Sequence, residues 1–237
     1  MRHAVQPTIA AMAQTPRYDG LADWYDRDFL GDALASPTRD TAVQLLGDGP
    51  GRLVDVGCGT GWHTVAFRDH GWTVTGVDVS TDMLRVASER GLDVVQGDAA
   101  ALPFDDGSFD AAVSLWTHTD VDDFGALLAE AVRVLRPGGP LVYIGAHPCF
   151  VGPHARFVSV EGVRELHDGY LDRGRYGSEA PGVGPDGLRA KVGGVHVPLG
   201  AFVQAFLHAG LTLERFEELA HHPYPFTIAM RWRLPRS

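Results

Sequence analysis

Long apolar runs, cysteine and an excess of basic charge are all lacking in this sequence. Its apolar runs are only a few residues long and are broken by Gly, Asp or Pro, whereas a membrane helix needs roughly 20 apolar residues. We therefore expect no membrane partner. Only two cysteines occur, Cys58 and Cys149. Because Cys58 stands in a glycine loop, a structural disulfide is not expected, and a reducing cytoplasm fits.

The balance of charge argues against nucleic acid as a partner. Asp and Glu number 30 against 20 Lys and Arg, and the formal net charge is −10, the wrong sign for neutralising many phosphates. Residues 1–17 lack the basic flank and the continuous apolar segment of an export signal. We expect a flexible tail there, one domain over 18–237 and a cytoplasmic location. The sequence does not indicate the oligomeric state.

What the sequence does contain is a regular alternation of strand and helix patterns, which predicts an α/β fold with a largely parallel sheet. The short link 221–225 allows the last strand only an antiparallel return. The predicted strands are residues 52–56, 73–77, 92–96, 109–115, 141–146, 211–219 and 226–234, and the predicted helices are 62–70, 81–90, 124–135 and 199–207.

Residues 147–197 interrupt this pattern as an insertion. The segment carries frequent Gly and Pro, four histidines and only a weak helical pattern at 160–171, and it is too long for an ordinary connection. Such a segment is usually a functional lid or a disordered insertion. Its aromatic residues favour a lid on the substrate side; they are Phe150, Phe157, Tyr170 and Tyr176.

A glycine loop follows the first predicted strand. Gly57, Gly59 and Gly61 place residues without a β-carbon where the chain turns into a helix and a ligand touches the backbone. Asp78 ends the next predicted strand, where a carboxylate accepts hydrogen bonds from ribose hydroxyls. Either feature alone also suits a plain strand-helix turn and a capping Asp. Trp62 stands where a nicotinamide-binding loop needs its third glycine, which disfavours a reductase.

Four segments in order resemble the motifs of class I S-adenosylmethionine-dependent methyltransferases, in their small-molecule branch (UbiE-like, methyltransferase type 11). Residues 53–61 resemble motif I, 77–84 the ribose-binding turn, 97–110 the adenine-side segment and 135–139 the motif before strand 5. The resemblance implies a Rossmann-like sheet of mostly parallel strands, seven in all, with the last strand antiparallel and helices on both faces.

The resemblance also implies S-adenosylmethionine as cofactor, S-adenosylhomocysteine as product, and a role for particular residues. The loop glycines would approach the methionine part, Asp55 would support the loop near the ammonium group, and Asp78 would bind ribose. An N-terminal helix over 18–46 would close over the cofactor. The complete predicted set is Tyr18, Tyr25, Asp55, Gly57, Cys58, Gly59, Asp78, Val79, Met83, Asp98, Ala99 and Ser114. Among these, a Met on a helix against a sheet is also typical of a core residue.

The candidate residues beside the methyl acceptor are inferred only from their position in the predicted sheet. His118 and His147 follow the predicted strands 109–115 and 141–146, at the edge where open α/β sheets bind ligands. An imidazole suits proton acceptance near neutrality, so both are candidate catalytic bases, with structural or substrate-shaping roles left open. We predict no metal, because the Asp-Asn-type pair of metal-dependent relatives is replaced by His147-Pro148-Cys149. The run around Asp120 and Asp122 is then read as a solvated helix start.

Together these observations predict methyl transfer to a small-molecule acceptor. The expected acceptor group is a hydroxyl of a secondary metabolite or quinone-like compound. N- or C-methylation stays open, as does a non-methylating enzyme such as a cyclase on the same fold, since function resides in the acceptor pocket. A nicotinamide-dependent reductase is the least favoured alternative.

Overall fold

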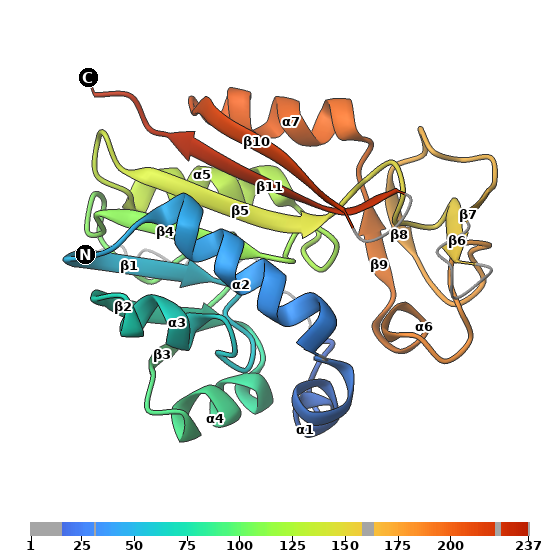
Figure 1. The fold of residues 1–237 in the computed structure, drawn as a ribbon, viewed down its shortest axis with the longest axis horizontal. Coiled ribbons are helices and arrows are strands. Elements are labelled where there is room, and N and C mark those ends of the chain that lie inside the picture. The colour runs from blue at the N-terminus through green and yellow to red at the C-terminus, as the bar shows by residue number, and fades with distance from the viewer. Residues whose placement is uncertain (1–15, 31, 158–163, 221–223, 237) are drawn as a thin grey trace, which may run out of the picture.

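A seven-stranded sheet forms the centre of the protein in a computed structural model that describes residues 16–30, 32–157, 164–220 and 224–236 (Figure 1). The strand order is β10-β11-β5-β4-β1-β2-β3. Only β11 runs against its neighbours, pairing antiparallel with both β5 and β10. The predicted sheet is therefore confirmed. The strands are β1 Gly51–Val56, β2 Trp72–Asp78, β3 Asp93–Gln96, β4 Ala111–Leu115, β5 Pro140–Ala146, β10 Thr212–Ala220 and β11 Pro225–Arg233.

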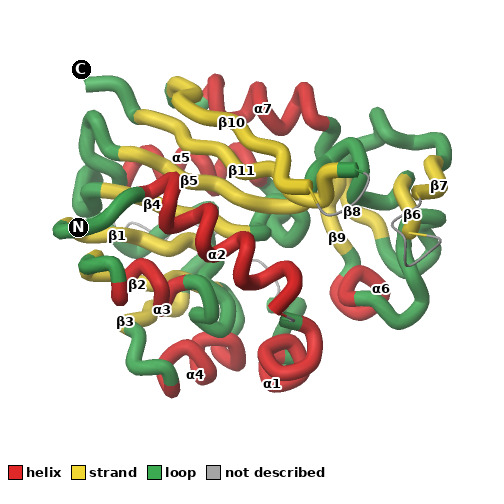
Figure 2. Tube along the Cα trace, viewed as in Figure 1, coloured by secondary structure: helices red, strands yellow, loops and turns green. Residues whose placement is uncertain are grey.

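Helices cover both faces of this sheet, as predicted (Figure 2). One face packs on α5 and α7, with Phe206 stacked on Trp232 of β11 at a ring-centroid distance of 4.6 Å. The opposite face packs on α2 and α3 through Leu45 and Phe67. Each such buried side chain stabilises the fold by about 1.5–3 kcal/mol. The bounds are α2 Asp32–Leu46, α3 Thr64–Asp69, α4 Thr81–Glu89, α5 Phe124–Val134 and α7 Leu199–His208.

The N-terminal segment is not the single helix predicted over 18–46. It is divided into α1 (Ala22–Trp24), the π-helical turn η1 (Tyr25–Phe29) and α2. Leu30 ends η1 with ψ of 71°, well outside helical backbone. The break turns α1 and η1 toward the carboxyl ends of the central strands, while α2 packs along the sheet (Figure 1).

The insertion forms a small unit beyond the carboxyl ends of β4 and β5, on the right of Figure 1. It contains two two-stranded sheets, β6-β7 and β8-β9, and the short helix α6. The weak helical prediction at 160–171 is wrong where it can be judged: β7 occupies its middle, paired with β6, and residues 160–163 lie outside the described residues. The bounds are β6 Ala155–Phe157, β7 Arg164–Leu166, β8 Gly174–Tyr176, α6 Leu188–Val192 and β9 Gly194–His196.

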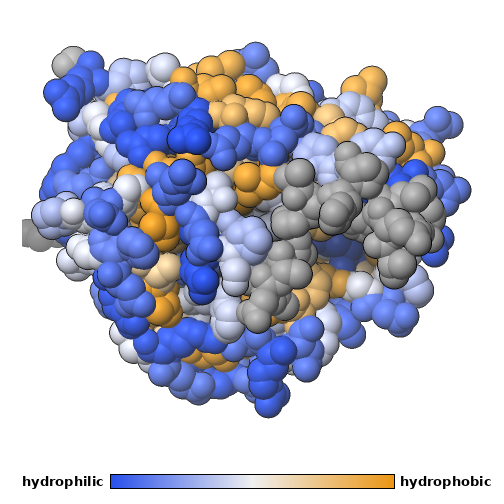
Figure 3. All heavy atoms as spheres, in the orientation of Figure 1, coloured by the Kyte–Doolittle hydropathy of each residue, from blue (hydrophilic) through white to orange (hydrophobic). Residues whose placement is uncertain are grey.

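Hydrophilic residues cover much of the described surface on the face shown in Figure 3, with hydrophobic residues in separate patches. Within the described ranges, no helix has the length and apolar character required to cross a membrane.

Candidate active site

Two adjoining cavities open at the carboxyl ends of the central strands. We name the first the loop cavity, because the glycine loop forms part of its wall. It is lined by Arg17, Tyr18, Tyr25, Gly57, Gly59, Val77, Asp78, Val79, Met83, Gly97, Ala99, Leu115, Trp116, Thr117, Asp120 and Val121. The second, the insertion cavity, has a volume of about 330 Å³ and lies between the insertion and the N-terminal segment. Tyr18, Tyr25, Trp116 and Asp120 line both cavities.

The three loop glycines serve different purposes. All have positive φ, of 78°, 54° and 75° for Gly57, Gly59 and Gly61, a conformation that favours glycine. A β-carbon at Gly57 would lie 2.4 Å from Thr117, and one at Gly61 would lie 2.3 Å from Leu92, so these two permit close packing. A β-carbon at Gly59 would meet nothing within 4 Å. Gly59 therefore leaves open space beside the loop cavity.

Asp78 holds the loop in shape as well as lining the loop cavity. Its Oδ2 accepts a hydrogen bond from the Gly59 N–H and its Oδ1 accepts one from the Ser80 N–H, both at 2.9 Å. Burial raises the pKa of this carboxyl, and the two backbone donors oppose that rise. A carboxylate with further lone pairs beside a cavity suits recognition of hydroxyl groups.

The buried side chain of Asp55 lies behind the wall of the loop cavity. Its Oδ2 accepts a hydrogen bond of 2.7 Å from the Thr64 hydroxyl at the start of α3. Its Oδ1 is buried and has no hydrogen-bond partner among the described residues. Burial raises the pKa of Asp55 to about 7. An unsatisfied carboxylate oxygen beneath the loop suits a cationic ligand group above it.

The predicted cofactor residues divide into those on the wall of the loop cavity and those behind it. On the wall are Tyr18, Tyr25, Gly57, Gly59, Asp78, Val79, Met83 and Ala99. Asp55, Cys58, Asp98 and Ser114 are not on it. The Cys58 side chain packs on Gly76, where a β-carbon would lie 2.8 Å from its sulfur. Ser114 is buried, with its hydroxyl donating to the Val56 carbonyl at 3.0 Å.

A hydrogen-bonded group that we name the Asp120 network connects three separate segments. The Tyr18 hydroxyl donates to Asp120 Oδ1 at 2.9 Å, and Arg189 of α6 donates to both oxygens of Asp120, at 2.5 and 3.2 Å. Arg189 also donates to the Thr119 hydroxyl at 2.8 Å. The side chains of Arg189 and Asp120 are 23% and 22% exposed. The network therefore joins the N-terminal segment and the insertion to the loop after β4.

This network corrects the prediction of a solvated helix start around Asp120 and Asp122. Asp123, not Asp120, caps α5, because its side chain accepts a hydrogen bond from the Ala126 N–H at 2.9 Å. Asp122 forms ion pairs with Arg17 and Arg175. Among the residues that the structure describes, no group of His, Cys, Asp and Glu has a metal-binding arrangement.

Trp116, which lines both cavities, has a strained backbone conformation. With φ of 64°, it is the one non-glycine residue with positive φ in the described ranges. For a bulky residue this backbone costs about 1–3 kcal/mol, and such strain clusters at functional sites. Its N–H donates to the Ile144 carbonyl at 2.7 Å, which fixes the turn after β4.

Neither predicted catalytic histidine lines a cavity. His118 is buried against Phe202 of α7 and hydrogen-bonds to the Tyr143 hydroxyl; burial lowers its pKa to about 3. His147 is 1% exposed. Its Nε2 bonds to Glu218 at 2.8 Å and its Nδ1 accepts from the Cys149 N–H at 3.2 Å. Their role as bases stays a prediction, and this geometry does not favour it.

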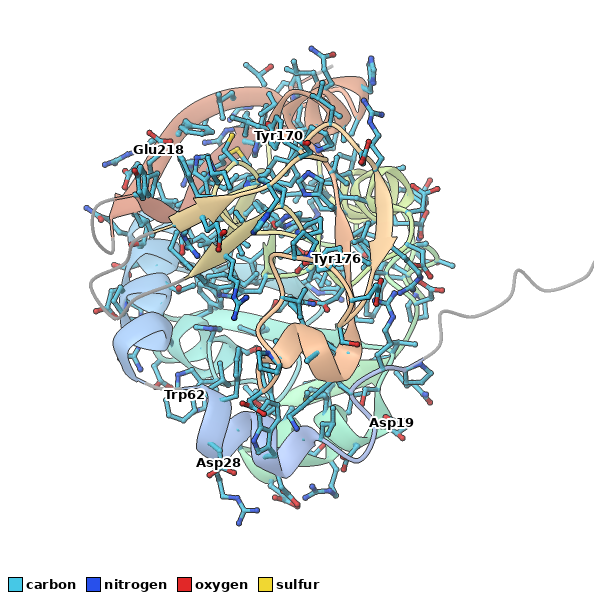
Figure 4. All side chains as sticks on the ribbon, turned by 90° about the vertical axis from the view of Figure 1, so that its right-hand side faces the viewer. Asp19, Asp28, Trp62, Tyr170, Tyr176 and Glu218 are labelled. Carbon is cyan, nitrogen blue, oxygen red and sulfur yellow. The ribbon has the colours of Figure 1, made fainter. Side chains whose placement is uncertain are left out.

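Sequence reasoning missed the polar residues of the insertion cavity. His63, at the N-cap of α3, and Arg164 and Arg189, in the insertion, all line it. Figure 4 views this side of the molecule, with Tyr176 of the insertion near the centre and Trp62 and Asp19 of the main domain below it. A lone histidine after a glycine loop, or an arginine in a segment without periodicity, gives no signal in the sequence. Only the fold brings them together.

Comparison with known proteins agrees with this architecture. Residues 54–143 match the sequence model of a family described as methyltransferase domain. The chain is 39% identical over 151 residues to a demethylmenaquinone methyltransferase of Renibacterium salmoninarum, covering 61% of each chain. It is 38% identical over 118 residues to a malonyl-[acyl-carrier protein] O-methyltransferase of Serratia marcescens, covering 47% of this chain and 46% of the relative. These matches span about half to three fifths of the curated relatives.

Among solved structures, the chain is similar to an S-adenosylmethionine-dependent methyltransferase from Mesorhizobium loti. The TM-score is 0.68 at 26% sequence identity, and the match covers 85% of this chain and 99% of that one. The similarity thus extends beyond residues 54–143 to most of the fold.

Proposed function

We propose that this chain, which carries a class I S-adenosylmethionine-dependent methyltransferase domain, transfers a methyl group to a small molecule held in the insertion cavity. The observation that carries the proposal is the junction of the two cavities. Tyr18, Tyr25, Trp116 and Asp120 line both, so a ligand in one cavity adjoins a ligand in the other.

The loop cavity fits S-adenosylmethionine, the methyl donor of such domains. Gly59 leaves room beside the loop, Asp55 keeps one buried oxygen without a partner beneath it, and Asp78 offers a carboxylate. Val79 and Met83 supply the apolar walls that an adenine ring requires. When bound, the donor supplies a methyl group already activated by a sulfonium.

The chain's own residues then have to orient the acceptor and exclude water. Effects of orientation are worth roughly 7–11 kcal/mol when a reactant is held in line with the bond that breaks. Trp116 lines both cavities at their junction, and Tyr18 and Arg189, joined through Asp120, hold the N-terminal segment and the insertion beside it. This arrangement encloses the reacting groups.

A hydroxyl of an apolar, quinone-like or secondary-metabolite acceptor is the finer part of the proposal. The insertion cavity is lined largely by apolar and aromatic side chains, including Phe29, Val151 and Phe226. The name of one curated relative, a demethylmenaquinone methyltransferase, supports a quinone-like acceptor, and that of the other, a malonyl-[acyl-carrier protein] O-methyltransferase, supports transfer to oxygen. N- or C-methylation and a cyclase that retains the cofactor are the alternatives.

The deciding experiment uses S-adenosylmethionine with a deuterated methyl group and measures both the methylated acceptor and S-adenosylhomocysteine. The protein is incubated with a panel of hydroxylated, aminated and unsubstituted ring compounds, and mass spectrometry quantifies labelled product and S-adenosylhomocysteine. We expect equal amounts of the two with hydroxylated members. A rearranged product formed without S-adenosylhomocysteine would instead identify a cyclase.

A further inference from the structure

We propose that His63 is the catalytic base of this site, and that the insertion cavity takes a ring-bearing hydroxyl compound whose O–H donates a hydrogen bond to the His63 imidazole. This inference rests on the proposed function, because it names the acceptor group and the proton acceptor of the same site.

The first argument for this role is the position of His63. It lines the insertion cavity and not the loop cavity. It is also the residue at the N-cap of α3, directly after the loop segment Gly59–Trp62. His63 therefore belongs to the acceptor side while standing next to the loop that borders the donor side.

The second argument is that the ring nitrogens of His63 lack hydrogen-bond partners within the described residues. Both Nδ1 and Nε2 are buried, and neither has a hydrogen-bond partner in the described part of the chain. A buried polar atom without a partner is costly, and in native structures it needs a reason. His118 and His147 differ, because their ring nitrogens bond to Tyr143, Glu218 or backbone. His63 is the histidine of the insertion cavity with open hydrogen-bonding capacity.

Burial keeps the His63 imidazole neutral. Burial and the nearby Arg39 of α2 lower its pKa to about 4. The cavity wall adds Arg164 and Arg189, with Asp120 as the carboxylate and the phenols of Tyr18, Tyr25 and Tyr176. A neutral imidazole has one nitrogen that accepts a hydrogen bond. At neutral pH, His63 is thus an acceptor for a hydroxyl and not a cation.

A weak base is sufficient for this reaction. As the acceptor oxygen forms its bond to the methyl carbon, the carbon-sulfur bond breaks and its electron pair stays on sulfur. The oxygen becomes strongly acidic as it loses electron density, so an imidazole with a low pKa still takes its proton. The O–H proton passes to His63, and the resulting imidazolium releases it to solvent when the product leaves.

The rest of the cavity selects the body of the acceptor. Its wall includes Phe29, Leu30, Leu188 and Phe226. The Arg164 guanidinium lies 5.5 Å from the centre of the Phe226 ring, so the wall offers both aromatic faces and a cation. These features suit a flat, electron-rich ring better than an aliphatic chain.

Two matched probes test the inference: 2-naphthol, and naphthalene, which lacks the hydroxyl. Calorimetry measures the affinity of each for the protein saturated with S-adenosylhomocysteine, in wild type, in His63→Leu and in the control His70→Leu. His70 is exposed and lies at the end of α3. We expect wild type and His70→Leu to prefer naphthol by about tenfold, and His63→Leu to lose that preference.

Three results would overturn the inference: naphthol that does not bind, a preference that survives in His63→Leu, or an S-adenosylhomocysteine affinity that falls more than about threefold in His63→Leu. His63→Asn keeps a polar side chain and serves as a second variant in case His63→Leu does not fold. We expect it to lower the rate of naphthol methylation by roughly 10²–10⁴. If the binding preference behaves as expected but wild type releases no S-adenosylhomocysteine with naphthol, the proposed function fails while the hydroxyl site stands.

Discussion

Replacing Arg189 by Met tests the attachment of the insertion to the main domain. The change keeps an unbranched apolar stem but removes the guanidinium that donates to both oxygens of Asp120 and to Thr119. An exposed ion pair contributes about 0–1 kcal/mol, and breaking a buried one costs about 3–5 kcal/mol. With both side chains little more than a fifth exposed, we expect a loss of about 2–4 kcal/mol in the free energy of opening α6.

Hydrogen exchange measures this loss directly. The Val195 N–H donates to the Thr119 carbonyl at 2.8 Å, which joins the insertion to the loop after β4. This amide is protected only while the insertion stays in place. A loss of about 2–4 kcal/mol accelerates its exchange by roughly 30- to 1000-fold, while amides of β1 in the centre of the sheet should exchange at the wild-type rate.

Arg175→Met is the matched control. Arg175 also belongs to the insertion and pairs with an aspartate of the same loop, Asp122, but the two side chains are 48% and 54% exposed. Its loss should change exchange by less than about tenfold. Equal acceleration in the two variants would refute the special role of Arg189, and no acceleration in either would show that packing alone holds α6.

Three further predictions concern the loop cavity. Asp78→Asn should weaken S-adenosylhomocysteine binding at least about tenfold in calorimetry, and an unchanged affinity would remove Asp78 from the site. Gly59→Val should fold but bind no cofactor. Gly91→Val, where φ is also positive at 72° and a β-carbon would meet nothing within 4 Å, should show similar strain and normal binding. Burial raises the pKa of Asp55 from its ordinary value of 3.8 to about 7, so this carboxyl binds more protons in the folded than in the unfolded chain between those pH values. The free energy of unfolding should therefore fall as pH rises from about 4 to 7, and Asp55→Asn should flatten that slope in urea titrations.

The sheet and part of the wall of the loop cavity were predictable because their signals are local. A strand that ends in Gly57 and a second strand that ends in Asp78 bring the two to one edge by the rules of parallel sheets. The wall residues Val79, Met83 and Ala99 follow from the same order of elements. Ser114 is not on the wall, because its hydroxyl is buried in hydrogen bonds to the Val56 carbonyl and to the hydroxyl of Thr117, which does line the loop cavity.

The acceptor side was not predictable because it depends on distant segments and on one unusual backbone angle. The rule that ligands bind after parallel strands led to His118. The chain after Trp116, whose φ is positive, instead carries His118 into the core against Phe202. Arg189 reaches Asp120 across 69 residues, a contact that no periodicity encodes. His63 is identified only by what it lacks, a partner for its buried ring nitrogens.

If the protein acts as we propose, two ligands meet at the junction of the loop cavity and the insertion cavity. The most direct measurement is a crystal structure of the protein with S-adenosylhomocysteine and 2-naphthol. We expect S-adenosylhomocysteine against Gly59 and Asp78, and naphthol in the insertion cavity beside Trp116 and Phe226, with its hydroxyl on His63. Naphthol found outside the insertion cavity, or S-adenosylhomocysteine away from the glycine loop, would contradict the proposal.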